Sequence, residues 1–108
     1  MHEDRAPDAQ LKKGILEICV LHMIREKPAY GYDVMKNVKK YFPEVNESTV
    51  YAILRRLHNE GRAQISTVAP IAGPMRKYYH LTESGKLLLE KSLASWRRLC
   101  DALKQMGL

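Results

Sequence analysis

One helical face within residues 46–61, NESTVYAILRRLHNEG, combines a cation, hydroxyl groups and small side chains. At 100° per residue, this side consists of Ser48, Ala52, Arg55 and Asn59, with Tyr51 at its border. An arginine can donate paired hydrogen bonds to a guanine edge or contact a phosphate, and small neighbours allow close approach. Acidic side chains, which a phosphate would repel, are absent from this side. These residue types therefore favour contact with a nucleic acid.

The opposite side of the same segment is apolar. Its residues, at positions i, i+3, i+4 and i+7, are Val50, Ile53, Leu54 and Leu57. This spacing predicts an amphipathic helix whose apolar side is buried. Asn46 is a favourable N-cap, and Gly61 suits the position just after a helix. We therefore expect a helix between these two residues, with its polar side facing outwards.

The chain carries a basic surplus that lies in the body of the sequence. Lys and Arg number 18 against 12 Asp and Glu, which gives a net charge of +6 and an isoelectric point near 9.4. Residues 11–42 hold seven basic residues against three acids, whereas residues 1–10 are net acidic. The positive charge favours an anionic partner without identifying it. The length of 108 residues and the 45% apolar share predict a folded chain with one hydrophobic core.

The sequence contains no motif typical of an enzyme or a metal site. Its histidines are His2, His22, His58 and His80. No two of them lie at metal-binding spacing together with a cysteine or carboxylate partner, and there is no Gly-rich phosphate loop and no HExxH motif. Cys19 and Cys100 are 81 positions apart among apolar residues, which favours buried thiols. We predict a non-enzymatic protein with no cofactor and no metal. A redox- or metal-sensing regulator using these side chains stays open as an alternative.

No segment of the sequence is long enough to cross a membrane. The longest apolar run, ILEICVLHMI at residues 15–24, includes Glu17 and is shorter than a bilayer requires. The N-terminus, MHEDRAPDAQ, is polar and acidic and does not resemble a signal peptide. We expect a soluble cytoplasmic protein with no membrane partner, in which residues 1–9 form a flexible tail.

Two further helices are expected before Asn46. A helix over about residues 8–25 has apolar residues on nearly all sides, so it must be covered on more than one side. In so short a chain, this pattern suggests a subunit interface. A second, short helix follows the segment KPAYGY and stops at Pro43.

A hairpin and a last helix are expected after Gly61. Residues 63–69 and 76–81 are rich in β-branched and aromatic residues and flank PIAGPM, which predicts a β-hairpin. Thr82 is a favourable N-cap for a helix that extends to about residue 106. The apolar residues of this helix follow steps of 4, 3, 4 and 3 and are Leu89, Leu93, Trp96, Cys100 and Leu103. Such a heptad seam is typical of helices that pair with one another.

The order of these elements predicts a mainly α fold with a small β-hairpin. Two short helices followed directly by a hairpin are typical of a winged helix-turn-helix, in which the second helix enters the DNA major groove. We assign residues 10–82 to a winged helix-turn-helix DNA-binding domain and residues 83–108 to a C-terminal dimerisation helix. A winged-helix adaptor that binds another protein is the alternative within the same fold, and the basic body disfavours it.

The chain also resembles the PadR family of bacterial transcriptional regulators. The resemblance covers about residues 10–106 and is carried by AYGYDVMKNV, NESTVYAILRRLHNEG, GPMRKYYHLTESGK and the Trp-bearing last helix. It implies a homodimeric winged-helix DNA-binding protein, usually a repressor, with dimer contacts from the first and last helices. The short single final helix resembles the compact branch of the family. Some short members bind flat aromatic compounds at the dimer interface against a tryptophan, and Trp96 matches that position.

These observations predict three sets of site residues. The predicted DNA contacts are Ser48, Thr49, Tyr51, Ala52, Arg55, Arg56, Lys36, Lys40, Arg76 and Lys77. The predicted dimer interface consists of Leu11, Ile15, Ile18, Leu89, Leu93, Trp96, Cys100 and Leu103. The predicted effector contacts are Trp96, Leu93, Cys100 and Ile15. Two alternatives stay open: Tyr51 could be a packing residue, and Trp96 could serve only as a dimer anchor.

The predicted partners are double-stranded DNA, a second copy of the chain and a planar aromatic small molecule. In this interpretation a homodimer binds an inverted-repeat operator, since two reading helices related by a twofold axis lie in successive major grooves. A ligand would relieve repression by binding DNA-competent and DNA-incompetent dimers with different affinities.

Overall fold

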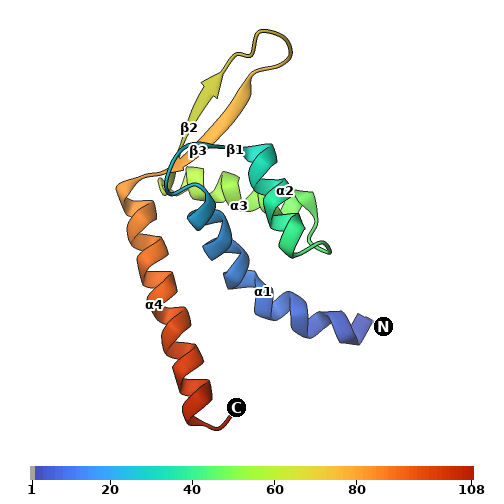
Figure 1. Cartoon of the computed structure of the whole chain (residues 1–108), viewed down its shortest axis with the longest axis vertical. Helices are drawn as coiled ribbons and strands as arrows, with labels where there is room; N and C mark the ends of the chain where they lie inside the picture. Colours follow the sequence, from blue (N-terminus) through green and yellow to red (C-terminus); the bar gives the residue numbers. More distant parts are fainter. Residues whose placement is uncertain (1) are drawn as a thin grey trace.

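A computed structural model describes the backbone of residues 2–108 and the side chains from residue 11 onwards. The elements follow in the order α1 (His2–Met23), β1 (Ala29–Tyr30), α2 (Gly31–Tyr41), α3 (Glu47–Asn59), β2 (Ala63–Val68), β3 (Arg76–Leu81) and α4 (Glu83–Gln105). The fold is mainly helical with one small antiparallel sheet, as the sequence predicts. The helices α1, α2 and α3 pack together, the β2–β3 hairpin extends away from them, and α4 leaves in the opposite direction (Figure 1).

The first helix is longer than the sequence suggests. It begins at His2, so it includes most of the segment that was expected to be a flexible tail. A helix already held by its packed portion can grow by single residues at little cost, because only nucleation is expensive. Among the side chains that the structure describes, those of α1 that enter the core include Leu16, Val20 and Leu21.

The core lies where α1, α2 and α3 meet. The predicted inner side of α3 is confirmed, because Val50, Leu54 and Leu57 are completely buried. They pack with buried residues from α1 and α2, among them Val20 and Val34. Since burying one such side chain contributes roughly 1.5–3 kcal/mol, this packing fixes the rotation of α3 about its own axis.

The sheet has three strands rather than the two that the sequence predicts. The hairpin of β2 and β3 is confirmed, with pairing from Ala63 opposite Leu81 to Val68 opposite Arg76. The additional strand β1 pairs with the other edge of β3, so the order is β1-β3-β2. With only two residues, β1 is too short to show any alternation in the sequence.

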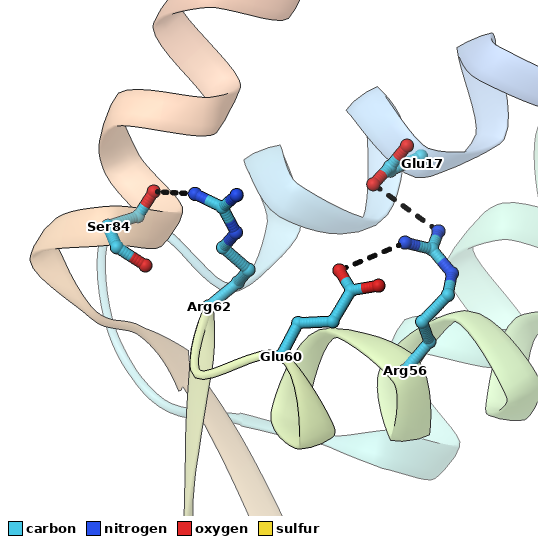
Figure 2. Close-up of polar contacts among 5 residues, drawn as sticks. All are labelled: Glu17, Arg56, Glu60, Arg62 and Ser84. Atoms are coloured by element: carbon cyan, nitrogen blue, oxygen red, sulfur yellow. Dashed lines mark hydrogen bonds and ion pairs between the residues drawn. The ribbon is translucent and has the colours of Figure 1, made fainter.

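A compact junction joins the end of α3, the base of the hairpin and the start of α4. Thr82 is the N-cap of α4, as predicted, and its Oγ1 accepts a hydrogen bond from the Gly85 amide at 3.1 Å. The same hydroxyl donates to the Gly61 carbonyl at 2.7 Å. Arg62 Nη1 donates to the Ser84 carbonyl at 3.1 Å (Figure 2). These bonds set the direction in which α4 leaves the sheet.

Gly85 permits the close approach within this junction and provides a test of it. A Cβ atom added there would lie 2.0 Å from the Arg62 carbonyl oxygen, which belongs to the backbone and cannot rotate away. We expect Gly85→Ala to lower the free energy of unfolding by about 1–3 kcal/mol, as measured by urea denaturation.

Gly14→Ala is the matched control, because an added Cβ at that position meets no atom within 4 Å. It should be neutral or stabilising by up to ~1 kcal/mol, since alanine is the better helix former. A Gly85→Ala variant as stable as the wild type would contradict the described junction.

Candidate functional site

The outer side of α3 is exposed, as the helical spacing predicts. We define the α3 outer face as Ser48, Thr49, Ala52 and Arg55, all of which are exposed to solvent. Because the opposite side of α3 is buried in the core, the helix cannot rotate about its axis, and this face must point to solvent. Between Glu47 and Glu60 the helix carries no acidic residue, so the face would meet an anionic surface without repulsion.

A hollow of about 540 Å³ separates the α3 outer face from the hairpin. We call it the tyrosine hollow; its lining includes Tyr30, Tyr32, Tyr51, Arg55, Lys77 and Tyr79. The structure thus brings together three predicted DNA contacts from two elements, Tyr51 and Arg55 of α3 and Lys77 of β3. The other tyrosines were not predicted as site residues, because only the pairing of β1 with β3 carries Tyr30 to this place.

Tyr51 is half-buried, so it contributes both packing and a polar hydroxyl. It packs against the core and lies beside the backbone of Gly31. Burial raises the pKa of the Tyr51 hydroxyl, and the neighbouring Glu47 carboxylate and tyrosines raise it further. A tyrosine hydroxyl is already protonated at neutral pH, and the raised pKa favours this form further, so Tyr51 can donate a hydrogen bond to an anion.

The remaining predicted cations lie on α2 and the hairpin, and three of them lie over tyrosine rings. Lys36 Nζ is 5.4 Å from the centroid of the Tyr32 ring, and Arg76 lies 5.1 Å from that of Tyr30. Lys40 lies over Tyr41 at 5.7 Å. All three cations are exposed, so each ring orients its cation while the charge stays accessible.

Arg56 differs from Arg55 because it has two acidic partners within the chain. Its Nη2 lies 3.3 Å from a Glu17 carboxylate oxygen on α1, and its Nη1 lies 3.3 Å from Glu60 (Figure 2). It follows Arg55 by 100° around the helix, and this rotation turns it towards α1. This side chain links α3 to α1 and is still 46% exposed, so a phosphate contact at Arg56 stays a prediction. No local pattern in the sequence reveals Glu17 as its partner.

A second concave surface lies between α1 and α4, which diverge towards their ends (Figure 1). We call it the interhelical groove; it has a volume of about 620 Å³. Its apolar lining comes from Leu11, Ile15 and Ile18 of α1 and from Trp96, Leu99, Cys100 and Leu103 of α4. Trp96 is 46% exposed, so the groove leaves almost half of this large side chain uncovered.

Two members of the predicted seam face inwards. Leu89 is 0% exposed within the subunit, so its assignment to the dimer interface is wrong. Leu93 is partly buried against the core and does not line the interhelical groove, so its contact with an effector stays a prediction. Leu99 was missed, although it lies three residues after Trp96 and is exposed. In a straight helix, positions seven residues apart do not point in the same direction. The heptad seam therefore rotates gradually around α4, and its early and late residues face different surroundings.

The two cysteines do not form a shared site. Each is half-buried and free, and burial raises the pKa of the Cys19 thiol. Among the residues that the structure describes, no three His, Cys, Asp or Glu side chains gather in a way that could hold a metal ion. Within the same residues, no helix is long and apolar enough to span a bilayer.

The three-helix core, the exposed α3 face and the basic hairpin define a winged helix-turn-helix protein. Residues 20–91 match the model of the transcriptional regulator PadR-like family. The chain belongs to this family of transcriptional regulators.

Solved structures agree with this assignment. A PadR-like transcriptional regulator from Bacillus cereus is 34% identical, with a TM-score of 0.77 over 90% of this chain and 95% of that chain. A PadR family regulator from Eggerthella lenta is 30% identical, with a TM-score of 0.83 over 97% of this chain and 94% of that chain. Bacillus subtilis PadR, solved in complex with operator DNA, is 28% identical with a TM-score of 0.65; the match covers 73% of this chain and 46% of that longer one.

The state of the Cys19 thiol leads to a prediction about redox sensing. The thiolate is the reactive form, and a raised pKa lowers its population at neutral pH. In a Cys100→Ser variant, we expect Cys19 to react with iodoacetamide more slowly than free cysteine between pH 7 and 8, with rates followed by mass spectrometry.

The Cys19→Ser variant, which retains Cys100, is the matched control for labelling at the second thiol. Alkylation of Cys19 faster than that of free cysteine would contradict the prediction and revive a sensor built on this residue.

Proposed function

We propose that the protein is a homodimeric repressor that binds a specific inverted-repeat operator through α3 and the hairpin. The observation that carries this proposal is the α3 outer face, which is exposed, free of acidic residues and continuous with the tyrosine hollow. Family membership and the net charge of +6 support the same partner. The complex of the related B. subtilis PadR with operator DNA provides a precedent.

In the proposed complex, the α3 outer face lies in the major groove. Ala52 allows close approach, Arg55 reaches a base edge or a phosphate, and the hydroxyls of Ser48 and Thr49 donate to nearby acceptors. Lys36 and Lys40 of α2 and Arg76 and Lys77 of the hairpin contact the phosphates on either side. Tyr51 donates its hydroxyl to the backbone from within the tyrosine hollow.

The interhelical groove supports dimerisation. Its exposed apolar side chains include Leu11, Trp96, Leu99 and Leu103, and together they form one continuous surface on two helices. A second copy of the chain would cover this surface by a self-complementary contact, as twofold dimers do. The twofold axis relates the two α3 helices, so the operator is an inverted repeat, and a spacing of about 34 Å, one turn of DNA, would place both helices in successive major grooves.

The same groove supports regulation by a small molecule. Its volume of about 620 Å³ lies within the range of sites that bind drug-sized ligands, and a planar aromatic compound could stack on Trp96. Glu17 lines the groove and also pairs with Arg56 of α3. A ligand that moves α1 in the groove would therefore also change the position of α3.

The two adjacent arginines of α3 test the DNA-binding surface. We expect Arg55→Ala to weaken operator binding by about 1–3 kcal/mol if it contacts a base, because the guanidinium is exposed on the outer face. Arg56→Ala is the matched control and should lose less affinity than Arg55→Ala, because the Arg56 charge is already paired with Glu17 and Glu60. Gel shifts with the DNA upstream of the protein's own gene, over a series of salt concentrations, provide the measurement.

The salt series separates reading of bases from contact with the backbone. If Arg55 contacts only a phosphate, its removal weakens binding to operator and random DNA equally. It also reduces the slope of log affinity against log salt concentration by about one, because one fewer counterion is released. If the wild type shifts neither DNA at low salt, the proposed function itself fails. Equal losses for Arg55→Ala and Arg56→Ala would overturn the assignment of the outer face.

Trp96 is the only tryptophan, so its fluorescence reports directly on the interhelical groove. We expect planar aromatic compounds to quench this emission and to release operator DNA at the same concentrations. We also expect Trp96→Ala to shift the monomer–dimer equilibrium towards monomer in sedimentation experiments.

Leu87→Ala provides a control, because Leu87 is an exposed apolar residue of α4 that does not line the groove. If Trp96→Ala dissociates the dimer but no compound of a broad panel quenches the Trp96 fluorescence of the wild type, Trp96 is a packing residue only. A dimer unaffected by Trp96→Ala would contradict the proposed interface.

A further inference from the structure

The end of the hairpin is apolar and exposed, and the contacts proposed above do not use it. We define the wing tip as residues 68–75, VAPIAGPM, which contain no polar side chain. Ile71 is 109% exposed, and Val68 and Met75 are also exposed. The hairpin carries this tip away from the packed helices (Figure 1). Ile71 therefore contributes nothing to the core, and folding does not explain an isoleucine at this place.

The charge around the wing tip favours an anionic partner. Residues 61–82 contain Arg62, Arg76 and Lys77 but no acidic residue. Arg76 is opposite Val68 in the last pair of the β2–β3 ladder, so a cation directly adjoins the apolar residues. Lys77 lines the tyrosine hollow on the side towards α3. A neutral protein partner would leave this positive charge unmatched, whereas a DNA phosphate would neutralise it.

The shape of the tip suits a narrow groove. The loop follows a two-stranded ladder and contains Pro70 and Pro74, whose rings fix one backbone dihedral each. Gly73, with φ of 105°, makes the reversal between them. The tip is therefore a stiffened, uncharged end only one loop wide. The DNA minor groove is about 6 Å wide and is bordered by phosphates on both sides.

The wing of a winged helix-turn-helix commonly reaches the minor groove, and we propose that here Ile71 is inserted there as a wedge between two base pairs. This inference rests on the proposed DNA-binding function and extends it to deformation of the DNA. With α3 in the major groove, the adjacent minor groove is the nearest one that the hairpin can reach, and Arg76 and Lys77 lie beside its phosphates. Apolar wedges that unstack one base step bend DNA towards the major groove. The operator thus carries a flexible pyrimidine–purine step at the wing position.

The test compares substitutions of Ile71 on operator DNA obtained by selection from random sequences. We expect Ile71→Ala to weaken operator binding roughly tenfold, because most of the inserted apolar surface is lost. It should also reduce the DNA bend measured by energy transfer between the DNA ends. The fluorescence of 2-aminopurine at the wing step, which rises on unstacking, should no longer increase. Ile71→Leu should retain all three signals.

Two controls separate a wedge from simple proximity. Met106→Ala removes a side chain that is 76% exposed at the far end of α4, and it should leave binding and bending unchanged (Figure 1). Ile71→Lys adds a charge that attracts phosphate, so it can restore affinity, but it should still abolish the bend and the 2-aminopurine signal. A bend that persists in Ile71→Lys would overturn the wedge.

Failure of this inference is distinct from failure of the proposed function. If the wild type binds its operator and Ile71→Ala binds and bends it equally well, only the wedge is refuted. If the wild type binds no DNA, both are refuted. Vesicles of phosphatidylserine and phosphatidylcholine form a further arm. Binding to them that depends on Ile71, with no effect of Ile71 on DNA, would assign the wing tip to a lipid surface instead.

Discussion

Burial of one side of α3 is the constraint on which the rest of the surface depends. Val50, Leu54 and Leu57 are completely enclosed by α1 and α2, and rotating the helix would expose them to water. Because burial of each contributes roughly 1.5–3 kcal/mol, exposing all three would cost roughly 4.5–9 kcal/mol. This loss is comparable to the roughly 5–15 kcal/mol of stability typical of a whole domain, so a rotated α3 is strongly disfavoured. The outward direction of Ser48, Ala52 and Arg55 is thus a consequence of core packing.

The junction at Thr82 has a comparable role for the other two surfaces. One hydroxyl accepts from the first turn of α4 and donates to the Gly61 carbonyl after α3, so it joins both helices. Gly85 lets α4 approach the Arg62 backbone more closely than any other residue would allow. The hairpin and α4 therefore leave the core from one fixed point and in opposite directions (Figure 1). The candidate DNA surface and the interhelical groove consequently lie at different ends of one rigid frame.

Local patterns predicted most of this fold, and the errors arose where distant segments meet. The apolar spacing of α3, its exposed outer face and the cap at Thr82 depend on neighbours within a few residues, so the sequence was sufficient. Strand β1 exists only because β3 offers it an edge. Arg56 turns to Glu17 because α1 crosses α3 at that point. Leu89 and Trp96 share one heptad seam but differ in burial, since that depends on where α1 and α4 diverge.

In the proposed regulation, a ligand in the interhelical groove could act on α3 through the Glu17–Arg56 ion pair or through the packed core that α1 shares with α3. The strengths of these two links decide between them. The Glu17–Arg56 pair is the visible polar link, but both side chains are partly exposed (Figure 2). Exposed ion pairs contribute about 0–1 kcal/mol, whereas allosteric coupling between sites typically requires 1–3 kcal/mol. The buried residues of α1, including Leu16, Val20 and Leu21, share one core with α3 and resist small displacements far more strongly. A ligand in the groove would therefore act on α3 mainly by shifting α1 as a packed body, with the ion pair adjusting to that shift.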